Sequence, residues 1–152
     1  MQDSAQRAPA VRTLCVPFLH LMTMTTYIEA WALPILQRAA SSLPLPLDIP
    51  AAAYTLLDEA GVEWHIEPTA EHLLIHCQLA DDGLQCDVDR LRTLLAHHHE
   101  PHVMDGACIA LDARSGVLRL VQAYASDSGA LHDLPAALQR LQAVRRRLLP
   151  SF

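Results

Sequence analysis

The sequence is short of glycine and of positive charge, and each shortage excludes a class of function. Only five of the 152 residues are glycine, and none belongs to a GxGxxG or phosphate-loop pattern that would cradle a nucleotide. The chain carries 11 basic against 17 acidic residues, a formal net charge of −6. A nucleic-acid-binding surface needs a dense basic face, so this charge argues against nucleic acid as a partner.

The sequence motifs of common hydrolases are also missing. There is no G-x-S-x-G nucleophile elbow and no HExxH zinc motif. Adjacent carboxylates occur at Asp58-Glu59 and Asp81-Asp82, but they fall at strand ends and turns, where neighbouring side chains point in different directions. Such pairs are typical of solvated turns rather than of acid–base catalysis. We therefore predict no catalytic residue and no cofactor.

The four cysteines, Cys15, Cys77, Cys86 and Cys108, include no CxxC pair. Cys77 and Cys108 lie inside apolar, strand-like runs, which favours free thiols in the core and a reducing cytoplasm. A disulfide between two of the four remains open from the sequence alone.

Apolar residues, in contrast, are abundant. The chain is 51% hydrophobic and 18% charged, with a mean hydropathy of +0.16, which is typical of a folded protein. Its length suits one domain with a proper core. So apolar a chain has more hydrophobic surface than one core readily hides. We expect the excess to be covered by a second copy or by a partner.

The N-terminal residues differ from the rest. The apolar stretch at 13–22 follows two arginines and resembles a weak signal-peptide core, but no small-residue cleavage site follows it. It is much too short to span a bilayer, so we expect no membrane insertion. Met22 and Met24 offer later starts. We expect residues 1–25 to be a disordered or wrongly assigned extension, and residues 26–150 to form a single domain.

The first half of that domain reads as one helix and three strands. An apolar stripe at helical spacing runs from residue 28 to 39, and Pro34 either kinks this helix or delays its start. The prolines of residues 41–50 end it. Alternating residues then predict strands at 53–59, 62–68 and 71–79, joined by short connections that favour an antiparallel meander.

The second half reads as a helix, a hairpin and a closing helix. Asp87 can cap a helix from Val88 to about His98, with an inner side made of Val88, Leu91, Leu94, Leu95 and His98. Residues 107–125 predict a hairpin whose turn lies at 112–116. Asp133 can cap an amphipathic helix that ends in three arginines, where cations suit the helix dipole. The order helix, three strands, helix, two strands, helix indicates an α+β fold, with helices packed on a mostly antiparallel sheet.

Histidines cluster at the end of the middle helix, in the stretch "HHHEPH" at residues 97–102. Consecutive helical residues diverge by about 100°, so His97, His98 and His99 cannot all reach one ion. His98 and His102 have a chelating spacing, but Pro101 interrupts that turn and a third ligand would have to come from elsewhere. We interpret the cluster as a solvated helix end and assign no metal residue. A small metal-binding enzyme or sensor that uses the His97–His102 cluster remains the alternative.

An ordered series of motifs resembles the class I chaperones of bacterial type III secretion systems, also called the Tir chaperone family. These motifs are "LPLPLD" (43–48) after the first helix, a strand pair, "LLAH" (94–97), "GACIALD" (106–112) and "SGVLRL" (115–120), followed by a closing amphipathic helix. Small size, acidity and high leucine content also fit. The resemblance covers residues 26 to about 150.

The resemblance implies a cytoplasmic homodimer without enzymatic activity. Such a protein binds the N-terminal segment of a secreted effector, keeps it partly extended and competent for secretion, and helps deliver it to the secretion ATPase. By pattern, the implied effector-binding residues are Ile28, Trp31, Ile35 and Leu36. The implied dimer-interface residues are Leu91, Leu94, Leu95, Leu118 and Leu120. Histidines close to a two-fold axis would also make the dimer sensitive to mildly acidic pH.

Overall fold

The computed structural model describes residues 28–43, 45, 53–80 and 88–149. The extension expected at residues 1–25 lies outside the described residues, as do Cys15, Cys86 and the capping residue expected at Asp87. Within the described part, ten short elements follow one another in the order expected from the sequence, with an added turn of helix after the middle helix and another before the last.

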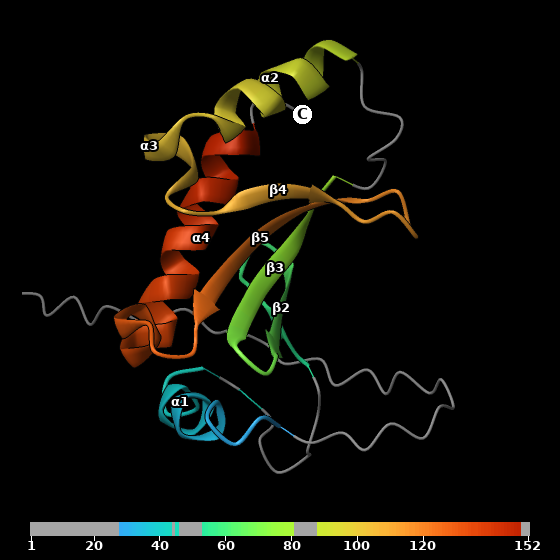
Figure 1. Ribbon diagram of the computed structural model, residues 1–152. Coiled ribbons are helices and arrows are strands. Elements are labelled where there is room, and N and C mark those ends of the chain that lie inside the picture. The colour runs from blue at the N-terminus through green and yellow to red at the C-terminus, as the bar shows by residue number, and fades with distance from the viewer. Residues whose placement is uncertain (1–27, 44, 46–52, 81–87, 150–152) are drawn as a thin grey trace, which may run out of the picture.

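One five-stranded antiparallel sheet forms the centre of the fold (Figure 1). The strand order is β1-β2-β3-β5-β4, so β1 and β4 are the two edges. The meander and the hairpin predicted from the sequence are both present, and the pairing of β3 with β5 joins them. The strands are β1 (Tyr54–Leu57), β2 (Glu63–Pro68), β3 (His72–Ala80), β4 (Cys108–Leu111) and β5 (Leu118–Ala125).

Side-chain alternation gives this sheet one buried face. Residues two apart point to the same side, and the inner positions of the central strands are almost completely buried, as at Trp64, Ile75 and Leu120. Cys77 belongs to this face and is a free core thiol, as predicted. The prediction of a core thiol is wrong for Cys108, which is exposed. Ile109 is partly buried against the core, so its neighbour Cys108 points to the opposite side.

The long helix α4 (Leu134–Leu148) covers the inner face of the sheet (Figure 1). The Asp133 carboxylate caps it as predicted, accepting from Ala136 N–H at 3.0 Å. Its buried stripe includes the apolar residues that recur at helical spacing in the sequence, which are Leu134, Leu138, Leu141, Val144 and Leu148. A 3-10 turn, η1 (Gly129–Asp133), leads into the helix. Each fully buried leucine of the stripe stabilises the fold by about 1.5–3 kcal/mol.

The first helix, α1 (Leu33–Ala39), begins later than its apolar stripe. Pro34 occupies the first turn, where a missing N–H costs nothing, so the late start, and not the kink, is observed. Residues 30–32 form a turn before the helix. The helix packs against η1 and the beginning of α4.

The middle helix, α2 (Val88–His98), packs against the edge strand β4 and is followed by a single turn, α3 (Pro101–Met104). The sequence-based inner side of α2 is only partly correct, because Leu94 is its one buried residue within the described chain. The helix lies beyond the edge of the sheet (Figure 1), so the described chain leaves most of its apolar face uncovered. Pro101, which was expected to stop α2, also starts α3.

Candidate protein-binding surfaces

The helices α1 and α2 lie at opposite ends of the molecule (Figure 1), and each contributes to an apolar surface. The first, the α1 surface, consists of Ile28, Trp31, Leu33 and Ile35. The second, the α2–β4 surface, consists of Val88, Leu91, Leu95 and Leu111. Both are built by elements at the margin of the sheet, where the chain's own core ends. Apolar residues that gather on a surface mark binding sites more often than scattered ones do.

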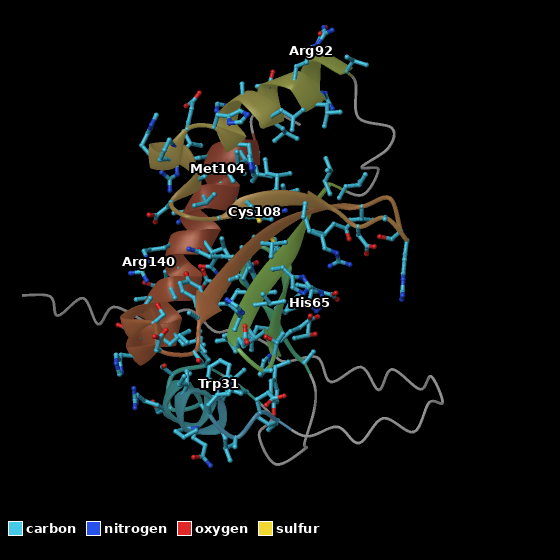
Figure 2. The ribbon with its side chains drawn as sticks, in the orientation of Figure 1. Trp31, His65, Arg92, Met104, Cys108 and Arg140 are labelled. Atoms are coloured by element: carbon cyan, nitrogen blue, oxygen red, sulfur yellow. The ribbon has the colours of Figure 1, made fainter. Side chains whose placement is uncertain are left out.

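The α1 surface is formed around Trp31. Figure 2 shows this side chain directed from the turn before α1 toward the end of the sheet. Its indole N–H donates to the Thr69 carbonyl oxygen at 3.0 Å, in the β2–β3 turn. The bond fixes the ring while leaving it only partly buried, and Ile28 and Ile35 are partly buried beside the core as well. The predicted effector-binding residues are thus brought together, with one exception.

That exception is Leu36, which is 0% exposed. It belongs to the core and offers no surface to a partner. Leu33, 36% exposed, was missed by the sequence reasoning. It lies outside the apolar stripe that predicted the helix, so helical spacing alone gave no signal for it.

The α2–β4 surface is the more exposed of the two. Val88, Leu91 and Leu95 are 61%, 36% and 52% exposed. Their spacing of three and four residues puts them on one face of α2. Leu111, 51% exposed, ends the edge strand β4 that α2 packs against. The β4 strand pairs only with β5 among the described strands.

The dimer-interface residues implied by the resemblance divide into two groups. Leu91 and Leu95 lie on the α2–β4 surface. Leu94, Leu118 and Leu120 are 0%, 5% and 0% exposed, and they pack in the core of the single chain. Periodicity gave both groups the same apolar pattern, and only the tertiary packing separates them. Val88 and Leu111, which the resemblance did not imply, are the other two exposed residues of the α2–β4 surface.

His98 ties α2 to the sheet. Its Nδ1 accepts from the Ile109 N–H at 3.3 Å, which assigns a proton to the other ring nitrogen when the ring is neutral. The His99 ring meets it edge-on, with centroids 5.9 Å apart. A metal ion at Nδ1 would have to displace this backbone contact.

Glu100 lies between two further histidines of the cluster. One carboxylate oxygen is 3.8 Å from His97 Nδ1, and the other is 3.5 Å from His102 Nε2. In the part of the chain that the structure describes, no three His, Cys, Asp or Glu side chains converge as a metal site would require. The arrangement therefore gives no support to the metal-site alternative.

A second histidine pair lies on the outer sheet face. The His65 and His76 rings stack with centroids 5.0 Å apart, and His65 Nδ1 is 3.1 Å from the Thr55 hydroxyl. His76 Nε2 contacts Glu67 at 3.0 Å. Burial, followed by the nearby His76, lowers the pKa of His65. The hydrogen bond from His76 lowers the pKa of Glu67. Figure 2 shows His65 on the side of the sheet away from α4.

Residues 44–149 match the Tir chaperone protein (CesT) family. The match covers more than half of the chain, and the chain therefore belongs to this family. The resemblance read from the sequence is confirmed. Among curated proteins, no sequence matches the chain significantly.

Solved structures share the fold as well. One chain of the HopA1–SchA chaperone–effector complex is 17% identical, with a TM-score of 0.58; the match covers 82% of this chain and 91% of that one. A chain of the ExsC–ExsE complex is 15% identical, with a TM-score of 0.59; the match covers 82% of this chain and 95% of that one. A chain of the heterodimeric ExoU–SpcU complex from the type III secretion system of Pseudomonas aeruginosa is 21% identical, with a TM-score of 0.59; the match covers 82% of this chain and 97% of that one. These likenesses confirm the predicted α+β fold.

Proposed function

We propose that this type III secretion chaperone binds the N-terminal segment of an effector on its α1 surface and dimerises through its α2–β4 surface. The family match over residues 44–149, which spans the sheet and the helices α2, α3 and α4, is the observation that carries the proposal. The two apolar surfaces left at opposite ends of the fold supply separate sites for the two kinds of partner.

The α1 surface suits an extended effector segment. Trp31 and Ile35 provide apolar contacts next to a sheet whose edge strand β1 pairs only with β2 among the described strands. An extended chain can add to such an edge through backbone hydrogen bonds, while its alternate side chains enter neighbouring apolar hollows. The backbone hydrogen bonds and the side-chain contacts both require an extended segment, so they keep the effector segment unfolded, as secretion requires.

The α2–β4 surface suits a second copy. Val88, Leu91 and Leu95 form a stripe on one face of a helix, and such a stripe can pack against its own symmetry mate about a two-fold axis. Leu111 on the edge strand extends the same surface. Burying these four side chains removes from water four of the six large hydrophobic side chains that are exposed in the described chain. We infer a homodimer on this basis.

The same proposal includes the site of action. We place the protein in the bacterial cytoplasm, where it delivers its effector to the secretion ATPase, and we assign it no enzymatic activity. In the described residues no helix is both long and apolar enough to cross a membrane. The free thiol of Cys77 suits a reducing compartment.

The test is capture of an effector by the chaperone. Chaperone genes of this family tend to neighbour those of their effectors, so the neighbouring gene product would be co-expressed with the chaperone and purified through a tag on the effector. We expect the two to co-purify. Failure of every neighbouring gene product, and of their N-terminal segments, to retain the chaperone would overturn the proposal.

Variants of α1 test the location. Leu33→Asp and Ile35→Asp place a charge in the proposed contact, and we expect the Kd for the effector segment to rise more than tenfold. Ala113→Asp, exposed in the β4–β5 turn, adds the same charge away from α1, and this matched control should leave the Kd unchanged. Equal affinities for all three variants would remove α1 from the site.

A further inference from the structure

A third surface feature is a cleft of about 420 Å³ between α4, the end of α1 and the β1–β2 turn. None of its lining residues comes from α2 or β4, and none belongs to the effector-binding set predicted from the sequence. A second copy bound at the α2–β4 surface would therefore leave the cleft open.

The floor of the cleft is apolar. Trp64 and Leu138 are 0% and 4% exposed, and Leu149 stands at the rim with 37% of its surface exposed. The Trp64 ring closes the base of the cleft and is covered by the core, with its indole N–H bound to the Asp58 carboxylate at 2.9 Å. An apolar side chain that enters the cleft would be removed from water together with the apolar surface that it covers. The Trp64 N–H would keep its hydrogen bond to Asp58, so no buried donor of the floor would lose its partner.

The α4 wall is basic, because Arg145 and Arg146 both line the cleft. The Arg145 Nε is buried and has no hydrogen-bond partner among the described residues. Neither arginine forms an ion pair within the described part of the chain. Their neighbour Arg147 differs, because its guanidinium donates to the His102 carbonyl oxygen at 2.7 Å. A buried donor without a partner is rare in native proteins and points to a missing acceptor.

The opposite wall carries Asp58 and Glu59. The Asp58 carboxylate is already engaged, since it accepts from Ala60 N–H, Val62 N–H and the Trp64 indole. Those three donors satisfy its charge locally and leave it a poor partner for the arginines. Arg145 and Arg146 are thus the charges of the cleft that have no ion-pair partner among the described residues. The Arg145 side chain also lies beside the buried Cys77 thiol.

We propose that this cleft is a second anchoring site for the effector, which receives a carboxylate side chain next to an apolar one. The carboxylate accepts from Arg145 and Arg146, and the apolar side chain packs on Leu149 at the rim and on the accessible edge of Leu138. A guanidinium suits this role because its planar fork can bind both carboxylate oxygens at once. The proposal rests on the proposed function, since the occupant is a segment of the same effector.

The experiment uses the full chaperone and the co-purifying effector segment. Arg145→Gln combined with Arg146→Gln removes both charges while keeping similar side-chain length. We expect the Kd to rise by about 10- to 100-fold. Arg114→Gln removes a charge from the exposed β4–β5 turn and is the matched control, with an unchanged Kd. Thermal unfolding of each variant checks that the fold persists.

Salt dependence gives a readout that a purely structural role would not move. Binding of the wild-type protein should weaken between 50 and 500 mM NaCl (about a 14 to 4 Å screening length), and the double variant should show a smaller change. A charge swap completes the test: Arg145→Glu should regain affinity for an effector segment in which the contacting Asp or Glu is changed to Arg.

The outcomes separate the two hypotheses. If the wild-type protein captures its effector and the double variant captures it equally well, the cleft is not an anchoring site, and the proposed function stands. If the double variant changes dimerisation instead, a second copy is the occupant and the inference is overturned.

Discussion

The Trp64 indole N–H donates to the Asp58 carboxylate at 2.9 Å, linking the β1–β2 turn to the most deeply buried ring of the core. The other carboxylate oxygen accepts from Ala60 N–H and Val62 N–H, each at 2.9 Å. One side chain thus closes the turn and satisfies a buried donor. Asp58 is a turn residue in sequence and a structural anchor in the fold.

Replacing Asp58 by alanine should therefore destabilise the protein. The change leaves the Trp64 N–H without its partner and opens the turn, and we expect a loss of about 2–3 kcal/mol in the free energy of unfolding. Glu59→Ala, an exposed neighbour, is the control and should change stability by less than about 0.5 kcal/mol. Urea unfolding measures both. Similar stabilities for the two variants would contradict the role given to Asp58.

The two described cysteines should differ in reactivity. Burial raises the pKa of the Cys77 thiol to about 12, against the opposing effect of the nearby Arg145 charge, whereas Cys108 is exposed. The thiolate is the reactive species, so Cys77 should be inert at pH 8. In a Cys15→Ser, Cys86→Ser background, a thiol reagent should label one cysteine quickly and the second only on unfolding. Two rapid phases in the folded protein would refute this.

A charge on the α2–β4 surface should separate the dimer. Leu95→Asp would place a carboxylate among apolar side chains, and we expect a monomer by light scattering at micromolar concentration. Thr93→Asp, on another face of α2 and also exposed, is the matched control and should remain dimeric. A wild-type protein that is itself monomeric, or a dimer that survives Leu95→Asp, would exclude this surface.

Stability should decrease in mild acid because of the outer histidine pair. The pKa of His65 is lowered in the folded chain by burial and by His76. Between that pKa and the unfolded value near 6.5, the unfolded chain binds more protons, so the free energy of unfolding falls as pH falls. The lowered pKa of Glu67 adds a second loss below about pH 4.5.

His65→Gln isolates this effect. The variant should show a weaker pH dependence of unfolding between pH 7.5 and 5.5 than the wild-type protein, as followed by urea titration at each pH. His99→Gln, exposed in the turn that follows α2, should keep the wild-type slope. Parallel curves for all three proteins would show that His65 does not contribute.

The sequence by itself determined the elements and their faces. Alternation predicted the meander, the hairpin and the inner positions of the strands, because a strand's period of two follows from backbone geometry alone. Helical spacing and the Asp133 cap predicted α4, whose buried stripe is the expected one. The motif order was enough to reach the family.

Only the tertiary structure decided which apolar faces are covered. Leu94 and Leu95 are neighbours with the same hydropathy, yet one is 0% and the other 52% exposed, because α2 lies at the margin of the sheet. The β3–β5 pairing that places the helix there joins residues about 45 apart, beyond the reach of any local pattern. The cleft at Arg145 likewise arises where α4, α1 and a distant turn converge. Local periodicity sets a residue's direction, and long-range packing sets what that residue meets.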